Sequence, residues 1–168
     1  MQRKIYLKKL CKLTNKYGKE NIVYFDESGF KANTGRLDGW AKRGSKIYAD
    51  IKGKREKRTN LLMAQRGKKW LAPLVFQGSC TAKLVEEWLE KFLMKELDNP
   101  SIIVMDNAPV HRKNIIGKIL EKKGHILLPL PKYSPDFNPI EQSFGAMKKR
   151  RQGMDINSTI EELILSYS

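Results

Sequence analysis

The chain of 168 residues contains only two cysteines, Cys11 and Cys80, and no Cys-x-x-Cys pair. Two isolated cysteines provide neither a zinc site nor a disulfide framework. No apolar run approaches the roughly 20 residues that a membrane-spanning helix needs. The N-terminus carries lysines throughout and lacks an apolar stretch followed by small residues, which excludes a secretory signal. Together these absences favour a folded cytoplasmic protein with no membrane partner.

Acidic residues are scarce relative to basic ones. Thirty-three Lys and Arg face eighteen Asp and Glu, which gives a net charge of +15. So large a charge opposes compaction and indicates a polyanionic partner, of which nucleic acid is the natural candidate. Basic proteins without such a partner also exist, so the charge predicts a partner class and no chemistry. The candidate phosphate contacts are Lys42, Arg43, Lys68, Lys69, Lys148, Lys149, Arg150 and Arg151.

The spacing of apolar residues predicts alternating strands and helices. We expect strands over 21–26, 60–65, 70–77, 101–106 and 125–130, and helices over 2–17, 82–97 and 113–123 and from about residues 139 and 159 onward. The strand over 101–106 is apolar throughout, which indicates burial on both faces. This order fits an α/β fold in which helices flank a mixed sheet.

Several local signals set the expected boundaries. Glu27-Ser28-Gly29 resembles a turn that ends the first strand. Pro73 marks an edge strand or a bulge. Asn138 is expected to cap the helix that begins near Pro139, because a proline tolerates the first helical turn. The four residues from Ser158 to Glu161 resemble a capping box.

Three acids stand out at the predicted element ends. Asp26 and Asp106 each close an apolar strand, and Glu141 lies in the first turn of a helix. Ligands of open α/β sheets bind at the carboxyl ends of the strands. Carboxylates that converge there without a basic partner suit a hard cation such as Mg²⁺. Taken singly, each acid is equally well explained as a turn former, a cap or a partner of the helix dipole.

The segments YFDESGF, VMDNAPVHR and LPKYSPDFNPIEQSFGAMKKR resemble the three blocks of the DDE superfamily endonucleases. The resemblance covers about residues 20–151. Within this superfamily the chain most resembles the bacterial insertion-sequence branch of the mariner-like transposases. Residues 107–140 separate Asp106 from Glu141, and this spacing of thirty-four residues is typical of that branch. The two long motifs Asp-Asn-Ala-Pro-x-His and Ser-Pro-x-x-Asn-Pro-Ile-Glu carry most of its specificity.

This resemblance implies a ribonuclease-H-like (retroviral-integrase-like) fold. It implies that Asp26, Asp106 and Glu141 are the catalytic residues and hold Mg²⁺ or Mn²⁺, with two ions at the site. Asn107, His111 and Asn138 would lie near the site. The activity implied is hydrolysis of transposon ends followed by strand transfer, with DNA as substrate, a homodimer as the assembly and the bacterial nucleoid as the location.

The chain departs from this family at its N-terminus. Such transposases carry a helix-turn-helix region before the catalytic domain, whereas about twenty residues precede the first predicted strand here. We therefore expect a basic segment over 1–20 and the catalytic domain over 21–168. The missing region points to a separate polypeptide from an upstream reading frame, a truncated copy or an excised domain. A structure-selective or RNA-cleaving nuclease and a catalytically idle DNA-binding remnant remain as alternatives.

Overall fold

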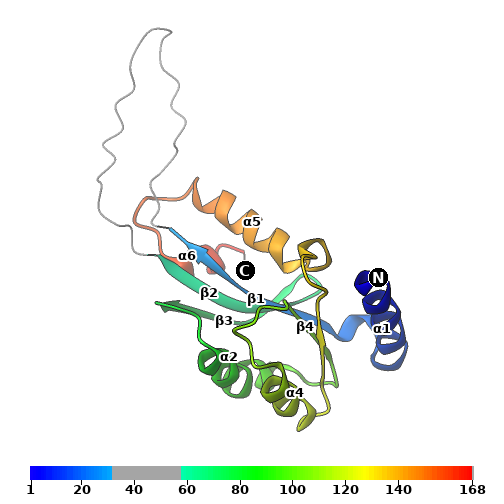
Figure 1. Ribbon diagram of the computed structural model, residues 1–168. Helices are drawn as coiled ribbons and strands as arrows, with labels where there is room; N and C mark the ends of the chain where they lie inside the picture. The colour runs from blue at the N-terminus through cyan, green and yellow to red at the C-terminus, as the bar shows by residue number, and fades with distance from the viewer. Residues whose placement is uncertain (32–57, 168) are drawn as a thin grey trace, which may run out of the picture.

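The computed structural model describes residues 1–31 and 58–167. Its sheet has five strands in the order β3-β2-β1-β4-β5 (Figure 1). Strands β1, β2 and β3 are antiparallel neighbours, and β4 and β5 run parallel to β1. The mixed sheet predicted from the sequence is confirmed. The strands span Ile22–Phe30 (β1), Thr59–Arg66 (β2), Lys69–Gln77 (β3), Ile102–Met105 (β4) and Ile126–Pro129 (β5).

Helices cover both faces of this sheet. Helices α5 and α6 lie over one face, α2 and α4 lie over the other, and α1 lies beside the β4 and β5 side (Figure 1). Three short helical turns, η1 to η3, join these elements. The bounds are Gln2–Tyr17 (α1), Lys19–Asn21 (η1), Ala82–Trp88 (α2), Leu89–Leu93 (η2), Met94–Glu96 (α3), Lys113–Glu121 (α4), Pro135–Phe137 (η3), Ile140–Arg151 (α5) and Ile160–Leu165 (α6).

The core explains why β4 is apolar throughout. Ile103 and Met105 pack with α2 and α4, whereas Ile102 and Val104 pack beneath α1. All four β4 side chains are buried, as expected for a central strand covered on both faces. Burial of this kind stabilises a domain by about 25 cal/mol per Å² of apolar surface. The packing therefore fixes the end of β4 and with it the position of Asp106, the next residue.

The first strand is longer than predicted. It continues through Glu27, Ser28 and Gly29 to Phe30, so the expected turn at these residues is wrong. The reason is a partner distant in sequence, because β2 pairs with this half of β1 and places Gly29 opposite Asn60. The parallel pairing of β1 with β4 ends earlier, at Tyr24 opposite Val104. Asp26 consequently lies on a continuing strand and not at a strand end.

Strand β3 carries the irregularity that Pro73 predicts. It is an edge strand, and its register against β2 shifts between Leu62 and Ala64. Ala72, just before the proline, has a φ of 47°, a conformation that non-glycine residues rarely adopt. Two side-chain contacts stabilise it: Trp88 Nε1–H donates to the Ala72 carbonyl at 2.7 Å, and the Ala72 N–H donates to Glu96 Oε1 at 3.0 Å.

Of the three predicted helix caps, one is confirmed and two are wrong. Thr81 caps α2 as predicted, because its hydroxyl accepts the Leu84 N–H at 3.2 Å. The capping box of α6 is formed by Thr159 and Glu162, one residue later than predicted. Asn138 does not cap α5 with its side chain, so that prediction is wrong. Its carboxamide is instead directed to Asp26, which matters for the site described below.

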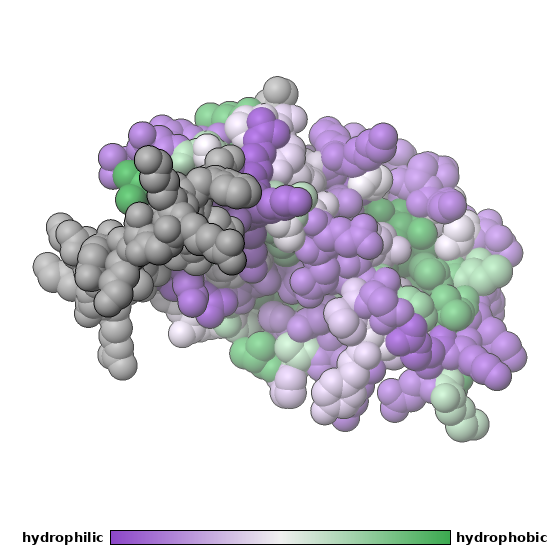
Figure 2. Space-filling model, turned by 90° about the horizontal axis from the view of Figure 1, so that it is seen from above, coloured by the Kyte–Doolittle hydropathy of each residue, from purple (hydrophilic) through white to green (hydrophobic). Residues whose placement is uncertain are grey.

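Among the described residues, no helix is long and apolar enough to cross a membrane. The face above α5 is predominantly hydrophilic, with smaller apolar areas between polar side chains (Figure 2).

Candidate metal centre

The fold brings Asp26, Asp106 and Glu141 to one face of the sheet. Asp106 directly follows β4, and Asp26 lies on β1 just past the last residue that pairs with β4. Alternate residues of a strand share a face. Asp26 therefore shares the face of Tyr24, which packs in the cluster beneath α5 and α6. Glu141 reaches the same place from the first turn of α5.

Asp26 sits in an unusual environment. Its Oδ1 accepts the backbone N–H of Glu27 at 2.8 Å, and its Oδ2 accepts Asn138 Nδ2–H at 3.2 Å. Burial raises the pKa of Asp26 from its usual 3.8 to about 7, although the Glu27 N–H lowers it. The charges of Asp106 and Glu141 and a hydrogen bond with Glu141 also contribute to this rise to about 7. Near neutral pH Asp26 is therefore partly protonated when no metal is bound.

The donor set of the site fits a hard dication. Its side-chain donors are carboxylates together with Asn138 Oδ1, a buried oxygen without a hydrogen-bond partner in the described structure. In the described ranges, however, no three His, Cys, Asp or Glu side chains already stand close enough together to hold an ion. Mutual repulsion opposes their closer approach, and a dication would cancel it. Asp26, Asp106 and Glu141 are accordingly the residues that could bind Mg²⁺ or Mn²⁺.

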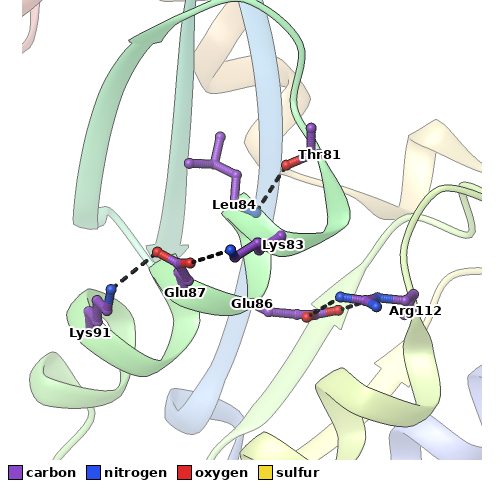
Figure 3. Close-up of polar contacts among 7 residues, drawn as sticks. All are labelled: Thr81, Lys83, Leu84, Glu86, Glu87, Lys91 and Arg112. Atoms are coloured by element: carbon purple, nitrogen blue, oxygen red, sulfur yellow. Dashed lines mark hydrogen bonds and ion pairs between the residues drawn. The ribbon is translucent and has the colours of Figure 1, made fainter.

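The loop after Asp106 is fixed from outside the site. His111 Nε2 lies 3.4 Å from Asp106 Oδ1, and the His111 side chain is only 12% exposed. The next residue, Arg112, donates from Nε and Nη2 to the two oxygens of Glu86 on α2, at 2.8 and 2.6 Å (Figure 3). A two-point arginine–carboxylate contact restricts orientation as well as distance. The Arg112–Glu86 ion pair thereby holds His111 beside Asp106. Asn107, which follows Asp106 in the sequence, is partly buried.

Helix α1 clamps the loop that presents Asn138 and Glu141. The Arg3 guanidinium forms a two-point ion pair with Asp136 and lies 4.2 Å from the centre of the Phe137 ring. Phe137 also stacks on Tyr6, with ring centres 5.5 Å apart. The clamped residues immediately precede Asn138. The sequence gives no sign of this clamp, because 133 residues separate Arg3 from Asp136 and no periodicity links them.

We expect Arg3→Ala to weaken metal binding more than it weakens the fold. An exposed ion pair contributes little to stability, because water and salt screen it. Loss of a residue that orients metal ligands through a second residue typically costs about 10- to 100-fold in affinity. The measurement is the Mg²⁺ concentration that half-saturates the rise in melting temperature. Lys4→Ala, an exposed change on the same helix, is the control, and Arg3→Asp with Asp136→Arg should restore affinity. Unchanged Mg²⁺ affinity in Arg3→Ala would show that the clamp has no positioning role.

Glu27 and Cys80 occupy the opposite face of the sheet. Glu27 alternates with Asp26 along β1, and its carboxylate accepts a hydrogen bond from the Cys80 thiol. Burial, followed by the Glu27 carboxylate, raises the pKa of Cys80 to about 12. The charges of Asp26 and Asp106 also raise this pKa, and the thiol stays protonated. The side chain of Glu27 lies on the other face of β1 from the side chain of Asp26.

The predicted phosphate contacts are not gathered in one place. Lys68 and Lys69 are exposed at the β2–β3 turn, beyond the pairing of Tyr24 with Gln65. The run Lys148–Arg151 lies at the other end of β1, where Arg151 Nη1 donates to the Lys31 carbonyl at 2.7 Å. Lys42 and Arg43 lie outside the described residues.

Three members of that basic run also have contacts within the fold. Arg150 donates to the Ser166 carbonyl at 2.6 Å and lies 4.3 Å from the Tyr167 ring centre. Arg151 and Lys148 both lie over the Phe30 ring. Lys148 and Lys149 are exposed, so they present free charge more readily than the two arginines do.

The strand order, with helices on both faces of a mixed sheet and acids contributed by β1, the end of β4 and the start of α5, defines a ribonuclease-H-like α/β domain. The family model of the DDE superfamily endonucleases matches residues 21–164. The chain belongs to this family, as its three sequence blocks predict. A comparison with curated proteins finds no match.

Solved structures of Mos1 have the same fold. The Mos1 mariner paired end complex with Mn matches with a TM-score of 0.78 at 20% identity, over 99% of this chain and 53% of that one. The pre-cleavage Mos1 transpososome gives 0.77 at 20% identity, over 99% and 54%. The catalytic domain of Mos1 mariner transposase gives 0.70 at 18% identity, over 99% and 78%. The chain thus spans about half the length of the Mos1 chains in the two complexes.

Proposed function

We propose that this domain is the catalytic part of a mariner-like DNA transposase of the bacterial insertion-sequence branch. In this proposal it hydrolyses a phosphodiester bond at a transposon end and then joins the freed 3′ end to target DNA. The observation that carries the proposal is that Asp106 and Glu141, from separate elements, lie near enough to partly buried Asp26 to raise its pKa. Membership in an endonuclease family and the fold of the Mos1 catalytic domain support it.

The proposed role of the three acids is to supply the negative charge that binds metal ions. Asp26, Asp106 and Glu141 would bind two dications, which when bound activate the attacking oxygen and stabilise the leaving oxygen at phosphorus. Asn138 orients Asp26 through the contact at 3.2 Å. His111 borders Asp106 and is placed to contact phosphate. No serine, tyrosine or cysteine nucleophile is required, because neither step forms a covalent enzyme intermediate.

The bonds exchanged are the same in both steps. In cleavage, a water oxygen bonds to phosphorus, the bond from phosphorus to the 3′ oxygen breaks, and a 5′-phosphate and a 3′-hydroxyl result. In strand transfer, that 3′-hydroxyl attacks a target phosphodiester and releases a target 3′-hydroxyl. Each nucleophile loses one proton and each leaving oxygen gains one, so no oxidant or energy source is consumed.

DNA is the proposed partner, held by the basic surface that includes Lys68, Lys69 and Lys148–Arg151. We further propose that residues 21–168 form the catalytic domain, and that recognition of the transposon ends depends on a helix-turn-helix region in addition to this domain. A homodimer would bring two transposon ends together. The solved Mos1 relatives are described as transpososome and paired end complexes.

Product analysis tests the proposal. A labelled DNA duplex bearing a preformed 3′-hydroxyl end is incubated with the protein, Mg²⁺ and a supercoiled plasmid. We expect labelled strands joined to the plasmid. Cleavage without joining would favour a structure-selective nuclease. Neither product, alongside retained DNA binding, would favour an idle DNA-binding remnant.

A further inference from the structure

The loop between β5 and α5 holds a fully exposed aromatic side chain. Tyr133 is 97% exposed, whereas Leu130 and Ser134, three residues before and one residue after it, are 4% exposed each. Most large apolar rings in this fold are buried, for example Phe25, Trp88 and Phe144. The exposed ring of Tyr133 contributes little to the packing of the core and is free to contact a ligand.

The backbone at Tyr133 is also unusual. Its φ of 54° lies in the left-handed region, which a bulky residue adopts only when its surroundings impose it. Non-glycine residues in this state cluster at ligand-binding sites. Glycine would adopt this conformation without strain. The chain therefore retains a side chain at a position where its backbone would be more relaxed without one.

Both ends of the loop are anchored to the candidate metal centre. The Leu130 N–H donates to the carbonyl of Met105, the residue before Asp106, at 2.8 Å. On the other side, Phe137 is held between Arg3 and Tyr6 of α1, and Asn138 contacts Asp26. Ser134 Oγ donates to the Lys132 carbonyl at 3.3 Å, directly across Tyr133. The ring is thus carried on a rigid frame that links Asp106 to Glu141.

The chemistry of the ring limits what it can bind. A flat aromatic surface beside the exposed cation Lys132, on a chain of net charge +15, suits a nucleobase with its phosphate. Bases inside a duplex are stacked on each other and do not offer a face. A base that has left the duplex exposes both of its faces and can stack on such a ring.

We propose that Tyr133 is a stacking platform for an unpaired DNA base next to the strand end that the metal centre processes. The inference rests on the proposed function, because it assumes a DNA strand at Asp26, Asp106 and Glu141. It adds a determinant of substrate form: DNA with an unpaired terminal base is bound in preference to fully paired DNA.

The test uses the full chain and two duplexes of equal length, one fully paired and one with a three-nucleotide unpaired end containing 2-aminopurine. Binding is followed in Ca²⁺ by anisotropy, and stacking by quenching of the 2-aminopurine fluorescence. Tyr133→Gly is the key variant, since it removes the ring and relieves the backbone. Phe92→Ala removes a second exposed aromatic, 49% exposed, from η2 on the other side of the sheet.

We expect Tyr133→Gly to lose the quenching and to bind the unpaired-end duplex about ten-fold more weakly, a typical effect for one stacked base. Its affinity for the paired duplex and its melting temperature should not fall. Tyr133→Phe and Phe92→Ala should behave like the unmodified protein. Retained quenching in Tyr133→Gly would overturn the proposal, and so would a fall in melting temperature with equal loss of both duplexes.

The two proposals fail in different ways. If the unmodified protein quenches the probe but neither cleaves nor joins DNA in Mg²⁺, the transposase function is wrong and the stacking site stands. If it joins strands and Tyr133→Gly favours unpaired over paired ends as strongly as the unmodified protein does, the function stands and the stacking site is wrong.

Discussion

Asp106→Asn is expected to abolish Mg²⁺-dependent strand cleavage while leaving the fold intact. Asparagine keeps the shape of the side chain and removes the negative charge that a pair of dications needs. We expect cleavage to fall at least roughly a thousand-fold, which corresponds to about 4 kcal/mol in the activation free energy. The assay measures initial cleavage rates of a labelled duplex at saturating Mg²⁺. The melting temperature should not fall, because Asp106 is partly exposed and its charge raises the pKa of Asp26.

Two matched control variants test whether loss of cleavage is specific to the three acids or follows the removal of any acidic side chain. Glu27→Gln removes the carboxylate adjacent to Asp26 on the opposite face of the sheet, where it contacts Cys80. Asp98→Asn removes an exposed acid from the loop before β4. Both variants should cleave like the unmodified protein. Cleavage at the normal rate by Asp106→Asn, or its loss in Glu27→Gln with the fold intact, would refute the assignment of the three acids.

The sequence predicted the three acids because their places in strands and helices follow from local patterns. An apolar run such as Ile102–Met105 defines a buried strand, and the residue after it must appear at the sheet edge. A helix that begins near Pro139 likewise places Glu141 in its first turn. The positions of strands and helices depend on residues close in sequence, so they can be predicted without the fold. The pairing of β1 with β4, which brings Asp26 near Asp106, joins segments far apart in sequence and could not be predicted in this way.

The surroundings of the acids could not be predicted in the same way. Strand β1 continues past Asp26 because it pairs with β2, which follows after a long separation. Asn138 was expected to cap α5, yet its carboxamide binds a carboxylate 112 residues earlier. The contact of Arg3 with Asp136 spans 133 residues. Each of these depends on tertiary packing, and a capping preference of about 1 kcal/mol is easily outweighed by such contacts.

The same limit applies to the basic residues. Composition predicts a polyanionic partner but not which lysines and arginines face it. Arg150 and Arg151 contact backbone carbonyls and aromatic rings within the fold. Contacts within the folded chain thus engage part of the positive charge that the sequence predicts for DNA binding.

Asp26→Asn is expected to make the metal-free protein more stable, not less. The pKa of Asp26 is about 7 in the fold and 3.8 ordinarily, so the folded state keeps a proton that the unfolded chain releases. The stability linked to this group is present below about pH 4, is lost as pH rises through 7, and stays absent above that pH. At about 1.4 kcal/mol per pKa unit, the deficit at pH 8 is on the order of 4 kcal/mol. Asparagine carries no such cost, although it also retains no charge for a metal.

Thermal or chemical unfolding in EDTA at pH 5 and pH 8 measures this difference. The unmodified protein should lose stability relative to Asp26→Asn as the pH rises, and Mg²⁺ should restore it at pH 8, because a ligand that binds only the folded state stabilises it. Asp26→Asn should gain little from Mg²⁺ at either pH. Parallel pH profiles for the two proteins in EDTA would contradict this account. A stabilised but inactive Asp26→Asn would show that the fold tolerates its buried acid at a cost in stability, because that acid is needed to bind metal.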